Sequence, residues 1–247
     1  MVTGDFNSLT WSPAPLGLKL RAEEVHLWRA SLDCDPSVLS RLEATLSPDE
    51  IARADRFVFE TDRSHFVAAR GILRELLGCY LLLSPAGLQF GYANRGKPSL
   101  EIGTGSSPLQ FNLSHSGGLA VYAFSPGRSL GIDVERIRPH LAGEDIARRY
   151  FAARELAELQ ALPPQLRAEG FFLCWTRKEA YVKARGAGLS IPLDSFAVSL
   201  TPGRSAELQS VDSARWSMHS FEPSTGYVAT IVGEGSGWSS HAWTWTP

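Results

Sequence analysis

The chain has 247 residues, of which 44% are hydrophobic and 20% are charged, the balance of an ordinary globular protein of one or two domains. Its formal net charge of −2 argues against a general nucleic-acid binder, which is normally basic. No apolar run reaches transmembrane length, and the N-terminus lacks the basic and apolar regions of a signal peptide. The cysteines, Cys34, Cys79 and Cys174, are far apart and lack zinc-ligand spacing, so we expect buried free thiols and a cytoplasmic protein with no membrane partner.

The first part of the chain predicts one strand and two helices. Residues 24–30 alternate between apolar and polar side chains, which is typical of a strand. The Ser-Pro-Asp-Glu segment at 47–50 predicts a helix start, with the serine as N-cap and the proline at the first helical position. A second helix is predicted to start at Thr61 or Asp62 and to end at Gly78.

Basic residues are concentrated in this helical region. Arg63, Arg70 and Arg74 recur at seven- and four-residue steps, so they share one helical face. Arg53 and Arg56 precede them on a separate short helix. A stripe of this kind is usually a solvated positive face. It becomes a candidate phosphate site only if a ligand nearby requires phosphate recognition.

Two polar segments follow. Turn residues place 92–98 in a loop that carries Lys97. The segment 111–118 is predicted to be a turn that gathers several hydrogen-bond donors, including Ser114 and His115, and such a turn can bind an anion. A serine nucleophile is disfavoured because Gly-x-Ser-x-Gly is absent, and a purely structural turn stays open as an alternative.

The stretch 129–137 alternates apolar residues with Gly131, Asp133 and Glu135, which predicts a strand with one buried face. Asp133 and Glu135 then emerge on the same side of the strand. Two carboxylates so close repel each other unless a cation lies between them, and a hard ion such as Mg²⁺ suits such oxygen ligands. The alternative is an edge strand with a solvated acidic face.

A helical segment is predicted at 145–162, closed by two prolines, and a second helix at 171–184. Glu179 falls on an otherwise apolar stripe of the second helix, where a carboxylate is costly unless it is paired or binds a cation. Lys183 lies one turn beyond and could simply pair with Glu179. From residue 191 onward the pattern is that of strands and turns.

The two halves of the chain have a similar rhythm. An arginine–aromatic signature at 53–59 is matched by one at 147–151, and each is followed by a long helix and then strands. We therefore predict an α+β protein that is a pseudo-twofold duplication of an α/β half. The N-terminal half would span residues 1–126 and the C-terminal half residues 127–247.

Three blocks of this sequence resemble the Sfp-type 4'-phosphopantetheinyl transferases: Phe-Asn-Leu-Ser-His-Ser at 111–116, Gly-Ile-Asp-Val-Glu-Arg at 131–136, and Trp-Thr-Arg-Lys-Glu-Ala-Tyr-Val-Lys-Ala at 175–184. A shorter match is Gly-Lys-Pro at 96–98, and the likeness covers roughly residues 45–200. The resemblance implies two halves that enclose coenzyme A in the cleft between them. It also implies an enzyme that transfers the 4'-phosphopantetheine arm of coenzyme A to a serine of an acyl or peptidyl carrier protein. The reaction would release 3',5'-ADP and depend on Mg²⁺, with Mn²⁺ as a possible substitute.

The resemblance also implies roles for individual residues. The metal ligands would be Asp133, Glu135 and Glu179. Glu179 and Lys183 would be the catalytic residues, with Lys183 also contacting phosphate. Glu179 would take the proton of the carrier serine directly or through a water molecule, bind the metal, or do both; the sequence leaves this open.

The nucleotide end of coenzyme A would be bound by Ser114 and His115, with His115 at the 3'-phosphate and Lys97 beside it. The family often has two lysines just after the Ser-Pro helix start, where this sequence has Glu50 and Arg53. The candidates to replace those lysines are the arginines Arg53, Arg56, Arg63 and Arg70.

Two other functions use the same residues. One is a Mg²⁺-dependent phosphohydrolase, and the other is an inactive module that binds coenzyme A or a carrier protein. The intact carboxylate set argues against the inactive module, which has no evident need for a metal site.

The shorter holo-acyl-carrier-protein synthases assemble as trimers, so the duplicated chain is expected to be a monomer. Carrier contact is predicted at 140–170, with Arg148 and Arg149 as its test.

Overall fold

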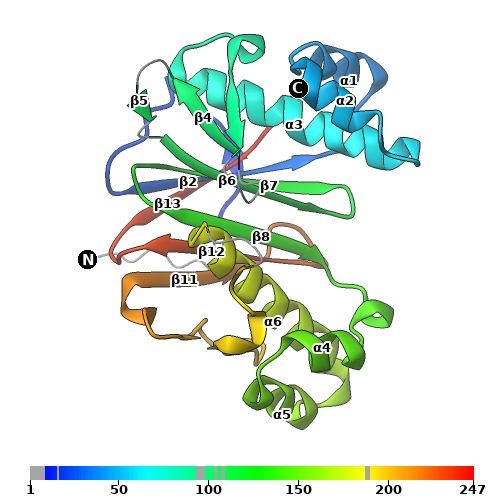
Figure 1. Ribbon diagram of the computed structural model, residues 1–247, viewed down its shortest axis with the longest axis vertical. Coiled ribbons are helices and arrows are strands. Elements are labelled where there is room, and N and C mark those ends of the chain that lie inside the picture. The colour runs from blue at the N-terminus through cyan, green and yellow to red at the C-terminus, as the bar shows by residue number, and fades with distance from the viewer. Residues whose placement is uncertain (1–8, 16, 93–97, 103–104, 107–108, 187–189) are drawn as a thin grey trace.

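The chain folds into four layers: helices, a sheet, a second sheet, and helices again (Figure 1). The computed structural model describes residues 9–247 except 16, 93–97, 103–104, 107–108 and 187–189. Helix α3 lies on the outer face of the first sheet with α1 and α2 packed against it, and α6 lies on the outer face of the second sheet with α5 packed against it. The described helices are α1 (Pro36–Glu43), α2 (Pro48–Ala54), α3 (Glu60–Leu81), α4 (Glu144–Tyr150), α5 (Ala153–Ala161) and α6 (Pro164–Ala184).

The first sheet has the strand order β1-β13-β2-β7-β6 and the second the order β11-β12-β8. Short strands form two further small sheets, β3-β4-β5 and β10-β9. The bounds of the strands are β1 Ser12–Pro13, β2 Glu24–Ser31, β3 Phe90–Tyr92, β4 Pro98–Ile102, β5 Gly105–Ser106, β6 Leu109–Ser116, β7 Leu119–Pro126, β8 Leu130–Arg136, β9 Ala197–Val198, β10 Leu208–Gln209, β11 Trp216–Phe221, β12 Tyr227–Glu234 and β13 Ser239–Thr244.

The two large sheets share a core. Leu27 of β2 and Val121 of β7 belong to the same buried cluster as Ile132 of β8 and Ile231 of β12. A second cluster lies between α3 and the first sheet, and a third between α6 and the second sheet. The apolar positions of the strand predicted at 129–137 therefore face the other half of the molecule, which leaves its alternate positions facing α6.

Each half has the same topology, which confirms the predicted α+β fold with an internal duplication. A strand is followed by helices and then by an antiparallel pair whose last strand lies in the middle, giving β2-β7-β6 in one half and β8-β12-β11 in the other. The sequence match of 53–59 with 147–151 was wrong in detail. Residues 53–59 end the second helix of their half, whereas 147–151 end the first. An arginine followed by an aromatic residue can indicate that a helix ends, but it does not identify which helix of the half this is.

The division between residues 126 and 127 falls between β7 and β8, and it stays a prediction. Strand β13 comes from the second half of the sequence but pairs in parallel with β2 of the first sheet. The two halves are thus linked both by a shared core and by one strand. None of the described helices combines the length and apolar character needed to cross a bilayer.

The polar turn predicted at 111–118 is instead strand β6. The turn is confined to Gly117 and Gly118, whose φ angles are 51° and 86°. Two consecutive residues with positive φ form the tightest hairpin connection, so the polar residues before them stay in the strand. They therefore alternate between the two faces of β6 rather than gather in a loop.

The helix boundaries also differ from the predictions. The helix predicted to end at Gly78 continues to Leu81, and Leu82 ends it with φ 55°. Gly78 is needed because a Cβ there would lie 2.8 Å from the carbonyl oxygen of Leu83, which follows the helix. The segment predicted at 145–162 is two helices, α4 and α5, separated by two extended residues. Pro164 begins α6 instead of only closing the preceding segment.

The three cysteines are free, as predicted, but they differ in exposure. Cys174 is buried in α6, Cys34 is half-buried, and Cys79 is exposed near the end of α3. The expectation of buried thiols is therefore wrong for Cys79.

Candidate active site

Strands β6 and β8, which come from different halves, run side by side and are joined by side chains. The amide oxygen of Asn112 accepts a hydrogen bond from the backbone N–H of Ile132 at 2.8 Å. The hydroxyl of Ser114 donates to Asp133 Oδ1 at 2.8 Å. Alternate residues of β6 thus contact successive groups of β8, which places the predicted nucleotide-binding serine against a predicted metal ligand.

Ser116 continues this series one step further. Its hydroxyl donates to Glu135 Oε2 at 2.6 Å. Asn112 and Ser116 were predicted to be donors of the same anion-binding turn as Ser114 and His115, but neither was predicted to contact the carboxylates of β8. The period-two spacing of 112, 114 and 116 was the signal that would have placed all three on one face of a strand.

Helix α6 lies directly on β8 because Gly131 has no side chain. A Cβ at Gly131 would be 2.2 Å from the carbonyl oxygen of Ala180 and 2.3 Å from the backbone nitrogen of Ala184. This close approach brings Lys183 to β8, and its Nζ donates to Asp133 Oδ1 at 2.6 Å and to Ser114 Oγ at 3.2 Å. Lys183 therefore forms an ion pair with Asp133 on β8, a partner that the helical spacing of Glu179 and Lys183 did not predict.

The carboxylates of the site are partly buried and close to one another. Burial raises the pKa of Glu179, and the negative charge of Asp133 raises it further, while Lys183 opposes the change. Burial also raises the pKa of Glu135, the Ser116 hydrogen bond lowers it, and the charge of Asp133 raises it again. Lys183 lowers the pKa of both Glu135 and Glu179, and Arg138 also lowers that of Glu135, so two positive side chains lie near three acidic ones.

The site's chemistry fits a hard cation. Asp133 Oδ2 is buried and has no hydrogen-bond partner among the described residues, and such an oxygen is costly unless something binds it. The described residues include no group of three or more His, Cys, Asp or Glu side chains placed to hold a metal ion as they stand. In this arrangement Lys183 supplies the positive charge next to Asp133. An oxygen-only set with a free carboxylate oxygen is the kind that Mg²⁺ prefers.

His115 lies on β6, close enough to Lys183 and Asp133 for their charges to affect its pKa. His115 is exposed, but desolvation by the protein around its ring lowers its pKa, the positive charges of Lys183 and His65 lower it further, and the negative charge of Asp133 opposes them. His65 comes from α3, and its Nε2 lies 2.9 Å from Asp33 Oδ1. Neither His65 nor Asp33 was predicted, because no motif links them to 111–116 and only the fold brings them near His115.

The arginine stripe of α3 is divided between the interior and the surface. Arg70 and Arg74 are buried, and their Nε atoms lie 2.5 and 2.6 Å from the two carboxylate oxygens of Glu50. The expected solvated face is therefore wrong for both. Because Arg70 is buried and forms an ion pair with Glu50, it is no longer a candidate ligand of coenzyme A.

The other predicted basic residues lie nearer the surface. Arg63 pairs with Glu43 at 2.6 Å and with Asp55 at 3.3 Å. Arg53 and Arg56 are exposed on α2 and just after it. Lys97 lies outside the described residues.

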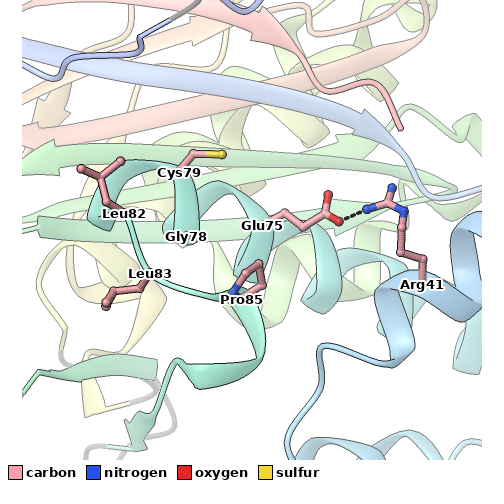
Figure 2. A pocket seen from close by; sticks show the side chains of 7 residues that line it. All are labelled: Arg41, Glu75, Gly78, Cys79, Leu82, Leu83 and Pro85. Atoms are coloured by element: carbon pink, nitrogen blue, oxygen red, sulfur yellow. Dashed lines mark hydrogen bonds and ion pairs between the residues drawn. The ribbon is translucent and has the colours of Figure 1, made fainter.

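A groove of about 600 Å³ lies elsewhere on the molecule, where α1 meets the end of α3. Figure 2 shows Glu75 in this groove, paired with Arg41, and Cys79 one turn further along α3. None of the predicted site residues lines it. The groove is therefore separate from the carboxylate site.

Comparison with known proteins agrees with the geometry. Residues 28–127 match the N-terminal model of 4'-phosphopantetheinyl transferases, and residues 129–232 match the 4'-phosphopantetheinyl transferase superfamily. The chain is 44% identical to the 4'-phosphopantetheinyl transferase HetI of Nostoc sp. (strain PCC 7120 / SAG 25.82 / UTEX 2576), over 95% of this chain and 98% of that protein. It is 29% identical to the 4'-phosphopantetheinyl transferase Sfp of Bacillus subtilis (strain 168), over 70% and 75% of the two chains.

A further 4'-phosphopantetheinyl transferase from Bacillus subtilis is 34% identical, over 65% of this chain and 69% of that one. The chain belongs to the 4'-phosphopantetheinyl transferase superfamily and is of the Sfp type. It is therefore a transferase, as the resemblance in blocks 111–116, 131–136 and 175–184 implied.

Proposed function

We propose that this protein transfers the 4'-phosphopantetheine arm of coenzyme A to the serine hydroxyl of an acyl or peptidyl carrier protein, in a Mg²⁺-dependent reaction that releases 3',5'-ADP. The observation that carries the proposal is the meeting of Asp133, Glu135 and Lys183 with Ser114 where the two halves join. Family membership supplies the reaction type, and the site supplies the residues.

Asp133 and Glu135 from β8 and Glu179 from α6 would hold the metal ion. The unpartnered oxygen of Asp133 and the mutual repulsion of the carboxylates support this assignment. When bound, Mg²⁺ would act as a Lewis acid toward the diphosphate and neutralise its charge. Mn²⁺ has similar ligand preferences and is the expected substitute.

The positive side chains would bind the phosphates. The side chain of Lys183 is 28% exposed, so its ammonium group can turn from Asp133 toward a bound phosphate. Ser114 and His115 would bind the nucleotide end, with Lys97 beside them. Arg53, Arg56 and Arg63 stay as candidates for the remaining phosphate contacts, because none of them is buried.

The transfer itself is a substitution at phosphorus. The serine oxygen of the carrier forms a bond to the phosphorus of the pantetheine arm, and the bond from that phosphorus to the ADP oxygen breaks. The electron pair leaves with 3',5'-ADP, and Glu179 takes the serine proton.

We further propose that the carrier docks on the region 140–170, close to the end of β8. Leu141 and Ile146 are exposed there, at 46% and 42%, next to Arg148 and Arg149 of α4. An acidic carrier surface would complement the two arginines. Changing both arginines to glutamate should raise the KM for the carrier, and an unchanged KM would remove this part of the proposal.

We expect the protein to act as a monomer, and its cytoplasmic location stays a prediction. One chain supplies both sides of the β6–β8 junction, so the site needs no second copy. The division into halves 1–126 and 127–247 is supported by the two family models, which meet at the same turn.

Analysis of the nucleotide products tests the proposed reaction. The enzyme is incubated with coenzyme A and Mg²⁺, with and without an apo carrier protein, and 3',5'-ADP is measured by chromatography. We expect 3',5'-ADP to appear only with the carrier and in equal amount to the modified carrier. Nucleotide release without a carrier would favour a phosphohydrolase, and binding of coenzyme A without products would favour an inactive module.

A further inference from the structure

One turn of α6, residues 176–179, is held by polar contacts on several sides. The hydroxyl of Thr176 lies 3.1 Å from that of Thr230 on β12. The guanidinium of Arg177 donates to Ser220 Oγ on β11 at 3.0 Å and to the carbonyl oxygen of Ser199 at 2.7 Å. Successive residues of a helix point about 100° apart. These contacts therefore restrain the rotation of the turn that carries Glu179.

The third residue that holds this turn is Lys178, which is completely buried. Its Nζ donates to the carbonyl oxygens of Leu193 and Phe196 at 2.6 and 2.8 Å. It also pairs with Glu155 of α5 at 2.8 Å, and that side chain is equally buried. A buried charge is tolerated only when it is paired and hydrogen-bonded. Lys178 therefore ties α6 both to α5 and to the chain that follows α6.

Glu155 extends the connection. Its two carboxylate oxygens accept hydrogen bonds from the backbone N–H groups of Ala152 at 2.6 Å and Val198 at 2.7 Å. The lysine and the glutamate together thus join α5, α6 and the segment 193–198 through fully buried polar contacts.

The first half of the molecule contains a counterpart. Arg74 of α3 is completely buried, lies 2.6 Å from Glu50 of α2, and donates to the carbonyl oxygens of Pro85 and Leu88 at 2.9 and 3.1 Å. In both long helices the buried cation is followed directly by a glutamate, Glu75 in α3 and Glu179 in α6. Glu75, however, pairs with Arg41 in the groove of Figure 2. A buried cation that is paired with a glutamate and bonded to two carbonyl oxygens therefore occurs in both halves. Only the one in α6, Lys178, lies next to a residue of the carboxylate site.

The carboxylates on β8 and α6 repel each other, so α6 needs support against this repulsion. Asp133 and Glu179 interact as like charges. The backbone of α6 packs directly against Gly131, so α6 cannot move closer to β8. We infer that Lys178 is a positioning residue, which holds α6 at the rotation that presents Glu179 to Asp133. The inference rests on the proposed metal-binding role of Glu179 and goes beyond it, because Lys178 itself does not touch the substrate or the metal.

The test compares Lys178→Met with Arg74→Met as the matched control. Each replacement removes one buried cation and its two carbonyl contacts. Free Mn²⁺ is measured by electron paramagnetic resonance during titration of each protein in the presence of coenzyme A and the absence of a carrier, and stability is measured by urea unfolding. We expect Lys178→Met to weaken Mn²⁺ binding at least tenfold and Arg74→Met to stay within twofold of the wild type.

Equal weakening of Mn²⁺ binding by both substitutions would overturn the inference, because it would show only a general loss of structure. Wild-type binding by a folded Lys178→Met protein would also overturn it while leaving the proposed function intact. If the wild-type protein bound no Mn²⁺ with coenzyme A, the proposed metal role would fall and the inference with it.

A second variant covers the possibility that Lys178→Met does not fold. The double substitution Lys178→Met with Glu155→Gln removes both charges and so avoids an unpaired buried carboxylate. We expect it to be more stable than the single variant and still to bind Mn²⁺ at least tenfold more weakly than the wild type, because the links to Leu193 and Phe196 stay broken. Full Mn²⁺ affinity in a folded double variant would contradict the positioning role.

Discussion

Asp133 is the residue on which the other side chains of the site converge. Its Oδ1 accepts hydrogen bonds from Ser114 and Lys183, and its Oδ2 is buried without a hydrogen-bond partner among the described residues. The charge of Asp133 also acts on Glu135 and Glu179. The site is therefore an acidic cluster whose charge Lys183 and Arg138 offset only in part.

Replacing Glu179 by Gln should lower kcat by roughly 10²- to 10³-fold, because the amide keeps the shape but can neither carry charge nor accept the serine proton. Steady-state transfer rates at saturating Mg²⁺ check this. Glu75→Gln, at the matching position of α3, should stay close to the wild type because Glu75 pairs with Arg41. A Glu179→Gln protein with full activity would exclude both proposed roles of this carboxylate.

His26 predicts a pH dependence of stability away from the site. Trp28 Nε1 donates to the Tyr80 hydroxyl at 2.9 Å, so the Tyr80 proton is free to bond His26 Nδ1 at 2.8 Å, which requires an unprotonated nitrogen. Burial, opposed by Glu24, lowers the pKa of His26 from 6.5 to about 4. The unfolded chain therefore takes up the proton first as the pH falls.

Stability from His26 is fully present above pH 6.5 and is lost as the pH falls from 6.5 toward 4, by up to about 3 kcal/mol. Urea unfolding of the wild type and of His26→Gln across this range measures the loss, with exposed His140→Gln as the control. The difference between the wild type and His26→Gln should shrink as the pH falls. A constant difference would show that His26 does not titrate in this way.

At the scale of elements, the contact between β8 and α6 determines whether the site forms. Gly131→Ala would place a Cβ 2.2 Å from a backbone oxygen of α6, so the helix must move. We expect a loss of about 1–3 kcal/mol in the free energy of unfolding and a fall in kcat/KM larger than that loss alone explains, because Glu179 and Lys183 move with α6.

Thermal unfolding and transfer kinetics check this prediction together. Gly87→Ala is a suitable control, since a Cβ there meets only Ser84 at 3.9 Å, an ordinary contact. If Gly131→Ala kept wild-type kcat/KM, the position of α6 on β8 would not matter for the reaction.

The sequence was informative where periodicity and function coincide. The alternation around Asp133 and the helical spacing around Glu179 placed these residues correctly on β8 and α6. It failed at β6, because polar residues followed by two glycines look like a loop when the partner strand is unknown. It also failed for Arg70, because charge spacing along α3 cannot reveal that Glu50 lies against it. Contacts between distant parts of the chain leave little trace in local pattern.

At the scale of the whole molecule, the two halves depend on each other. Leu27 and Val121 on the first sheet pack against Ile132 and Ile231 on the second, and β13 completes the first sheet from the far end of the chain. Burying this apolar surface is the main favourable term in folding. Either half alone would expose it to water.

We therefore expect fragments 1–126 and 127–247 to be unfolded when expressed separately and to co-purify as a folded pair when expressed together. Amide dispersion in two-dimensional NMR spectra of each fragment and of the pair distinguishes the outcomes. Cooperative unfolding of the isolated fragment 1–126 would contradict the interdependence of the halves.

The most direct measurement of the proposed reaction is intact mass spectrometry of an apo acyl carrier protein incubated with this protein, coenzyme A and Mg²⁺, with an EDTA control. We expect the carrier to gain the mass of one phosphopantetheine arm and EDTA to abolish the gain. A gain that EDTA leaves unchanged would contradict the metal role of Asp133, Glu135 and Glu179. No gain with acyl and peptidyl carriers alike, despite binding of coenzyme A, would contradict the proposed transfer.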